Sequence, residues 1–207
     1  MKNANVRRMV VLGLLTAIML VMSWTPLGYL NIGPLAITLN VIPLAVAAIT
    51  LGPMGGTVTG AVFGLTSFLQ CIGVGGVSLM GEMLFSINPL LAFTQRFVPR
   101  VLDGLIIGVA FGIIKNRVGV RKACYVTGFL AAFLNTALFM TALVLLFGNT
   151  EYVQNLVAGR NVILFICTFV GINAIFEMLA CTVISGAVGS ALHKAGVITQ
   201  KYPRNGE

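Results

Sequence analysis

Long apolar runs dominate the sequence, and short polar or Gly/Pro-containing segments separate them. A helix needs about 20 predominantly apolar residues to cross the ~30 Å hydrocarbon core of a bilayer. A transmembrane β-barrel would instead show short segments in which apolar and polar residues alternate. We therefore expect an all-α integral membrane protein, a bundle of six transmembrane helices. The spans cover about residues 10–24, 36–51, 55–73, 90–114, 123–147 and 162–192.

Composition supports this class of fold. Of the 207 residues, 58% are hydrophobic and only 9% are charged, and the mean hydropathy is +1.01. A soluble domain carries about 25% charged residues, so this chain has too few to cover a surface that faces water. No linker or low-complexity tail divides it, and residues 1–207 are predicted to form a single six-helix membrane domain.

The net charge of +8 does not indicate nucleic-acid binding, because the basic residues cluster between apolar runs. The clusters are near the N-terminus, between the fourth and fifth spans, and near the C-terminus. With six crossings all three fall on one side of the membrane. Since basic loops favour the cytoplasmic side, both termini are predicted to be cytoplasmic. Arg7 and Arg8 precede the first span, but no A-x-A-like cleavage site follows it, so we expect that helix to be retained.

Charged side chains inside the spans are costly in lipid and call for a function or a partner. Arg96, Arg100 and Asp103 are spaced i, i+4, i+7 and share one face of the fourth span. One interpretation is an internal Arg100–Asp103 pair that holds helices together. Arg96 has no acidic residue one turn away along the helix, so it is the stronger candidate for an anionic group of a ligand.

Polar residues in the last two spans reach similar depths. Asn173 and Glu177 are spaced i, i+4, and Asn135 and Thr136 lie near the middle of the fifth span. We expect a polar pocket, open to the outside, between the fourth, fifth and sixth spans. The alternative is interhelical hydrogen bonding in which Arg100 neutralises Glu177.

Glycines recur at every fourth residue in two spans and predict close helix packing. One series is Gly56, Gly60 and Gly64, and the other is Gly104, Gly108 and Gly112. Gly13 and Ala17 form a similar small pair in the first span. The partner of that pair could be internal or another subunit.

Sequence motifs for catalysis are lacking. The chain has one histidine, His193, and it has no HExxH motif, no Walker A motif and no cluster of metal-ligand residues. The cysteines at 71, 124, 167 and 181 lack metal-site spacing and are predicted to be packing residues. We expect no enzyme activity, no ATPase site, no cofactor and no metal.

Several segments together resemble the substrate-binding (S) components of energy-coupling factor (ECF) vitamin transporters. They are Ile37–Pro43, Leu51–Gly56 running into Gly60–Ser67, Arg100–Gly104, Leu134–Thr136 and Asn173–Glu177, and their order covers nearly the whole chain. The segment from Thr25 to Leu30 is most similar to the pantothenate branch. Folate and riboflavin remain possible ligands.

The resemblance implies a multi-pass protein of a prokaryotic plasma membrane that captures a vitamin from outside. Its partners would be a transmembrane coupling (T) subunit, contacted through Gly13 and Ala17, and two cytoplasmic ATPase subunits. Family ligands lie under the outer loops, which adds Tyr29, Asn31 and Glu82 to the predicted site. The predicted substrate-binding set is Tyr29, Asn31, Glu82, Arg96, Arg100, Asn135, Asn173 and Glu177. The alternative function is a stand-alone channel or secondary transporter for a small anionic solute, with Arg96, Asp103 and Glu177 as an ion relay.

Overall fold

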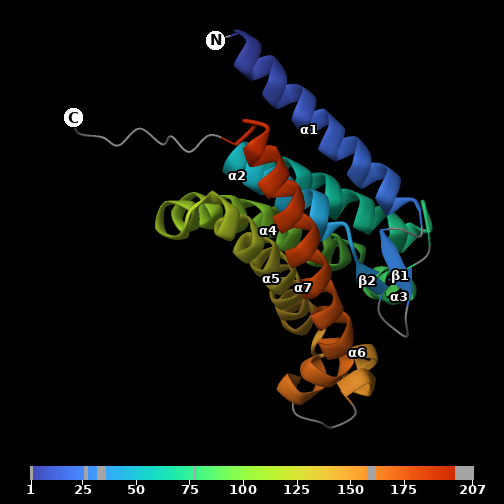
Figure 1. The fold of residues 1–207 in the computed structure, drawn as a ribbon. Coiled ribbons are helices and arrows are strands. Elements are labelled where there is room, and N and C mark those ends of the chain that lie inside the picture. The colour runs from blue at the N-terminus through green and yellow to red at the C-terminus, as the bar shows by residue number, and fades with distance from the viewer. Residues whose placement is uncertain (1, 26–27, 32–35, 77, 158–161, 199–207) are drawn as a thin grey trace.

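The computed structural model describes residues 2–25, 28–31, 36–76, 78–157 and 162–198 (Figure 1). Within them, five helices are long and apolar enough to cross a membrane. These are α1 (Lys2–Ser23), α2 (Val41–Leu69), α4 (Pro89–Val118), α5 (Val120–Phe147) and α7 (Val162–Lys194). The predicted all-helical membrane fold is confirmed, apart from one small β-hairpin. The count of six crossings and the side on which the termini lie remain predictions.

Helix α2 covers the region where two spans are predicted, and the chain bends sharply inside it. Gly52 has φ 73° and ψ −159°, a backbone conformation that suits glycine, and the next residue, Pro53, cannot donate a helical hydrogen bond. A Cβ atom built on Gly56 would lie 3.1 Å from the Cβ atom of Ala48. Residues eight apart in a straight helix are about 12 Å apart. The chain therefore folds back, and α2 consists of a first arm, Val41–Leu51, and a second arm, Pro53–Leu69.

The glycine series lie where the second arm of α2 packs against α4. A Cβ atom on Gly56 would collide with the carbonyl oxygen of Gly104, and one on Gly104 would collide with that of Gly56. A Cβ atom on Gly60 would likewise meet the carbonyl oxygen of Arg100. The predicted close packing is thus confirmed. Gly112 is an exception, because a Cβ atom there would have nothing within 4 Å.

Helix α1 packs on the rest of the bundle along one face only. Met19 is fully buried against the first arm of α2, and Leu15 packs on Val46 and Ala47. Gly13 and Ala17 are exposed on the opposite side, and a Cβ atom on Gly13 would have nothing within 4 Å. Figure 1 shows α1 at the edge of the bundle. The small pair therefore does not serve internal packing among the described residues.

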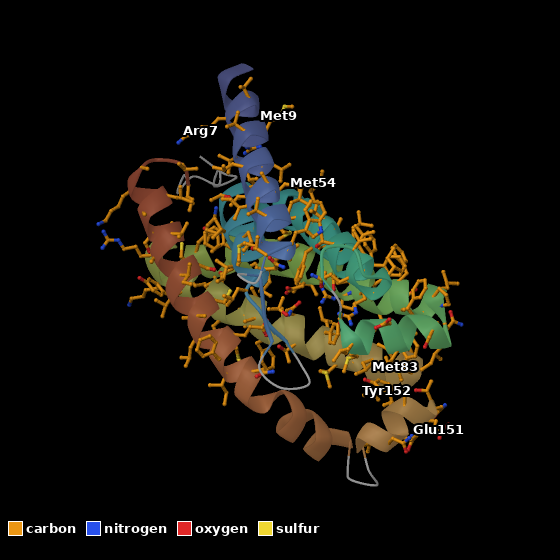
Figure 2. The ribbon with its side chains drawn as sticks, turned by 90° about the vertical axis from the view of Figure 1, so that its right-hand side faces the viewer. Arg7, Met9, Met54, Met83, Glu151 and Tyr152 are labelled. Carbon is orange, nitrogen blue, oxygen red and sulfur yellow. The ribbon has the colours of Figure 1, made fainter. Side chains whose placement is uncertain are left out.

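The predicted basic clusters gather at one end of the molecule, which we call the basic end. There Arg7 Nη1 donates a hydrogen bond to the carbonyl oxygen of Gly196 at 3.4 Å. Basic residues at this end are Arg7, Arg8, Lys115, Arg117, Arg121, Lys122 and Lys194; Lys201 and Arg204 lie outside the described residues. Figure 2 shows Arg7 at one end of the molecule and Glu151 at the other.

The opposite end, which we call the loop end, contains short elements that the sequence analysis did not predict. Helices α3 (Leu79–Ile87) and α6 (Glu151–Val157) follow the α2 and α5 helices, a 3₁₀ turn covers Gln70–Ile72, and strands β1 (Tyr29–Asn31) and β2 (Ala36–Thr38) pair antiparallel. Leu84 of α3 and Val153 of α6 are buried in one cluster with Leu143 and Phe147 of α5. This burial holds both short helices against the ends of the long ones.

Candidate functional site

Arg96 lies on α4, seven residues after Pro89 and so about 10 Å from the helix start at the loop end. It is only 6% exposed. Its Nη1 donates to Ser67 Oγ at 3.4 Å and its Nη2 to Ser78 Oγ at 3.1 Å. The guanidinium carbon is 5.3 Å from the ring centroid of Phe139. All of these partners are neutral, so they orient the guanidinium without cancelling its charge.

Arg100 lies one turn deeper in α4, and its side chain extends toward Arg96 and Phe139. Its Nη1 donates to the carbonyl oxygen of Arg96 at 2.8 Å. Its guanidinium carbon is 5.0 Å from the Phe139 centroid and 4.5 Å from the Phe63 centroid. Cation–π contacts of this kind offset part of the cost of burying a cation. Two positive charges nevertheless meet at one aromatic ring, which favours the approach of an anion.

Asp103 is fully buried, and neither of its carboxylate oxygens has a hydrogen-bond partner among the described residues. The positive charge of Arg100 acts on Asp103, so the Arg100–Asp103 pair remains an interpretation. Gln95 is also fully buried with neither amide atom bonded to a described group, and the sequence analysis did not single it out. Buried polar atoms without partners are uncommon in folded proteins, so both residues are candidates for contact with a polar ligand.

Glu177 connects α7 with the β-hairpin. Its Oε1 accepts a hydrogen bond at 2.8 Å from the backbone N–H of Thr38, at the end of β2. The side chain is 6% exposed, and the positive charge of Arg100 acts on it. The carboxylate therefore holds the hairpin against the helix that also carries Asn173. Sequence spacing could not show this contact, because its donor is a backbone group 139 residues away.

The other predicted site residues have different surroundings. Asn135 on α5 is 7% exposed, Asn173 on α7 is half-buried, and Glu82 on α3 is exposed. Tyr29 and Asn31 form part of β1, but their side chains lie outside the described part of the chain. The structure thus brings Arg96 and Arg100 together, and it ties Glu177 to the hairpin.

Helix α3 approaches Arg96 through a glycine. A Cβ atom on Gly81 would lie 2.9 Å from Arg96 Nη2 and 2.7 Å from Cys71 Sγ. Ser78 is the N-cap of α3, and its Oγ also accepts from the N–H of Gly81 at 3.2 Å. One hydroxyl therefore fixes both the start of α3 and the position of the Arg96 guanidinium. A serine placed after two glycines and before an apolar run is a helix N-cap signal, so its cap could have been predicted, but its contact with Arg96 could not.

Tyr152 of α6 also belongs to this environment. Burial raises the pKa of the Tyr152 phenol, while the positive charge of Arg96 lowers that pKa by a smaller amount. Figure 2 shows Tyr152 at the loop end. An aromatic ring with a hydroxyl is thus placed within electrostatic range of the site. Tyr152 lies between the fifth and sixth predicted spans, where no helix is expected from the sequence.

The chemistry of these groups suits recognition of a small, polar anion. Guanidinium groups donate strong hydrogen bonds to carboxylates, serine hydroxyls and amides donate and accept, and aromatic rings pack on apolar parts of a ligand. In the described part of the chain, no group of three or more His, Cys, Asp or Glu side chains could hold a metal ion.

Comparisons with known proteins assign the chain to a transporter family. The sequence profile of the family described as "ECF transporter, substrate-specific component" matches residues 7–188. The pantothenate transporter PanT of Leuconostoc mesenteroides is 30% identical over 93% of this chain and 95% of its own length. The pantothenic acid transporter PanT of Lactococcus lactis is 27% identical over 94% of this chain and 98% of its own length. The chain belongs to the family of substrate-specific components of ECF transporters.

Proposed function

We propose that this chain is the high-affinity pantothenate-binding subunit of an ATP-driven ECF importer in a bacterial plasma membrane. The observation that carries the proposal is the buried guanidinium of Arg96, which has only neutral partners in the described chain and has Arg100 beside it. The names of two full-length relatives support the choice of ligand.

The chemistry of pantothenate fits the groups around Arg96. Its single carboxylate would accept charge-assisted hydrogen bonds from the guanidinium and displace the weaker serine contacts. Its amide and hydroxyl groups would bond the side chains of Asn135, which is buried, and of Asn173, which is half-buried. Phe139 would pack against the branched carbon skeleton. Folate or riboflavin would need a larger site and a different set of contacts.

The proposed transport cycle requires partners, since the sequence has no Walker A motif. We infer that the exposed face of α1 with Gly13 and Ala17 meets a transmembrane coupling subunit, which two cytoplasmic ATPases drive. Strand β2 together with the first arm of α2 would make one crossing and the second arm the next, giving six crossings with both termini in the cytoplasm. The loop end would then face outside, where the vitamin enters.

Mass spectrometry of small molecules that co-purify with the detergent-solubilised protein tests the ligand. Pantothenate in the extract, together with saturable binding by titration calorimetry, is the expected result. Binding of a different vitamin with no measurable pantothenate affinity would overturn the choice of ligand.

Uptake by proteoliposomes tests the mechanism. Vesicles that contain this chain alone should bind pantothenate without accumulating it, and addition of a coupling subunit and ATPases with internal ATP should start uptake. Accumulation driven by a proton gradient in vesicles with this chain alone would instead establish a secondary transporter.

A further inference from the structure

A cavity of about 940 Å³ opens at the basic end, far from the vitamin site. Its walls come from the start of α1, the turn of α2 around Gly52, the last turns of α4 and the segment after α7. Figure 2 shows Arg7 near this end of the molecule. The described tail folds back there, because the carbonyl oxygen of Ile198 lies 3.0 Å from His193 Nδ1 and the side chain of Ile198 is buried.

The charges on this cavity are all of one sign. Arg7, Arg8, Lys115 and Arg117 line it, and none of the described residues that line it is acidic. The described acidic residues, Glu82, Asp103, Glu151 and Glu177, do not line it, and Glu207 lies outside the described residues. Arg7 bonds to a neutral carbonyl, and Lys115 Nζ lies 5.7 Å from the Phe111 ring centroid. Four cations around one hollow favour an occupant with a phosphate group.

The inner wall of the cavity is apolar. Val109 and Ile113 line it and are 47% and 55% exposed. They lie on α4 up to eight residues before Arg117, which is about 12 Å toward the middle of the bundle. Val10 and Leu14 on α1 are also exposed, 63% and 59%, and they lie next in sequence to or one turn from Val11, which lines the cavity. An occupant with an anionic head and an apolar tail would satisfy both parts of the cavity.

We propose that this cavity binds an anionic phospholipid. The phosphate lies among Arg7, Arg8, Lys115 and Arg117, and one acyl chain runs along Val109 and Ile113. Basic pockets between helices at the membrane surface bind anionic headgroups, and each nearby cation strengthens binding about fivefold. A free phosphate shares the headgroup chemistry but leaves the apolar wall without a partner. This inference does not depend on the identity of the vitamin.

The first experiment separates lipid from free phosphate. Native mass spectrometry of the full chain in detergent measures binding of phosphatidylglycerol, of phosphatidylcholine with the same acyl chains, and of glycerol 3-phosphate. We expect phosphatidylglycerol to bind at least tenfold more tightly than either of the others. Equal binding of the two lipids, or glycerol 3-phosphate binding as tightly as phosphatidylglycerol, would overturn the proposal.

A matched pair of double variants locates the site. Lys115→Gln/Arg117→Gln removes two charges from this cavity. Arg121→Gln/Lys122→Gln removes the same charge at the same end but from a separate cavity of about 500 Å³. The first variant should weaken phosphatidylglycerol binding about tenfold, a value below the sum of two full cation contributions. The second should change it by less than about twofold, because Arg121 and Lys122 do not line the cavity and the attraction falls off with distance from the phosphate.

A control for the fold and two contrary outcomes complete the test. The thermal unfolding temperature of the same samples should stay unchanged in both variants, which shows that the fold is intact. If both variants lose phosphatidylglycerol affinity equally, the lipid is attracted diffusely to a basic surface, and the proposed binding site is overturned. Unchanged lipid affinity combined with lost assembly on the coupling subunit would also overturn it, because the cavity would then receive an acidic protein surface.

Discussion

The energetic consequence of changing Arg96 follows from its neutral partners. We predict that Arg96→Ala weakens pantothenate binding by ~1.5–3 kcal/mol, about ten- to a hundredfold, the range for hydrogen bonds to a charged group. Arg96→Lys should recover only part of the loss, because an ammonium lacks the planar fork that meets a carboxylate. Titration calorimetry on the solubilised protein measures both. Unchanged affinity in Arg96→Ala would make Arg96 a structural residue.

Glu177 allows a prediction about the β-hairpin. In Glu177→Ala the N–H of Thr38 loses its acceptor, which costs ~1–3 kcal/mol if that group stays buried. The hairpin should therefore open more often, and amide hydrogen exchange at Thr38 should become faster. Glu177→Gln keeps a carbonyl oxygen in reach and is the control. If exchange is equally fast in both variants, the carboxylate acts through its charge and not as a hydrogen-bond acceptor.

Sequence reasoning at the residue scale identified the cations but not their partners. Arg96 and Arg100 can be identified from the sequence because a charged side chain in an apolar span is costly in lipid, whatever its contacts in the fold. Ser67 and Phe139 are ordinary residues for their helices, and they gain a role only because folding places them beside Arg96. Such contacts depend on helix rotation and crossing, which a single sequence does not specify.

At the scale of elements, the interface between α2 and α4 depends on glycine. We predict that Gly60→Ala lowers stability by ~1–3 kcal/mol, the usual cost of overpacking, because the added methyl group meets the backbone of Arg100. Gly112→Ala adds the same atom where nothing lies within 4 Å, so stability should be unchanged or slightly higher, given the better helix propensity of alanine. Thermal unfolding in detergent compares the two. A similar loss in both variants would contradict the packing argument.

The long helices could be predicted from sequence, and the short elements could not. A run of about 20 apolar residues has few alternatives in a membrane, which is why α4 and α5 match their predicted spans closely. Helix α6 has seven residues and each strand has three, too few to establish a period. The bend at Gly52 was expected as a boundary between spans, but sequence did not indicate how closely the two arms pack.

At the scale of the whole molecule, the two ends differ in charge and predict an orientation. Asn116 follows Lys115 at the basic end, and Ser86 lies on α3 at the loop end; both are exposed. In intact cells, an impermeant thiol reagent should label Ser86→Cys and leave Asn116→Cys unlabelled until the membrane is opened. The wild type gives the background, and Cys71, Cys124 and Cys181 are buried. Labelling with the reverse pattern would place the termini outside.

The proposed docking on a coupling subunit would link the whole molecule to transport. Most of the α1 surface is open, and Gly13 and Ala17 make its exposed face locally flat. Flat faces allow helices to approach closely in lipid, where van der Waals packing drives association. Because a side chain at position 13 meets no described atom of this chain, a bulky residue there should disturb a partner and not the fold.

We therefore predict that Gly13→Leu abolishes ATP-driven uptake in proteoliposomes that contain the complete transporter. Pantothenate affinity of the isolated variant, measured by calorimetry, should equal that of the wild type. Gly13→Ala adds a single methyl group and should keep most of the uptake, so the pair forms a series in side-chain size. If Gly13→Leu folds but no longer binds pantothenate, the face belongs to the vitamin site instead. If it both binds and transports normally, the coupling subunit docks elsewhere on the molecule.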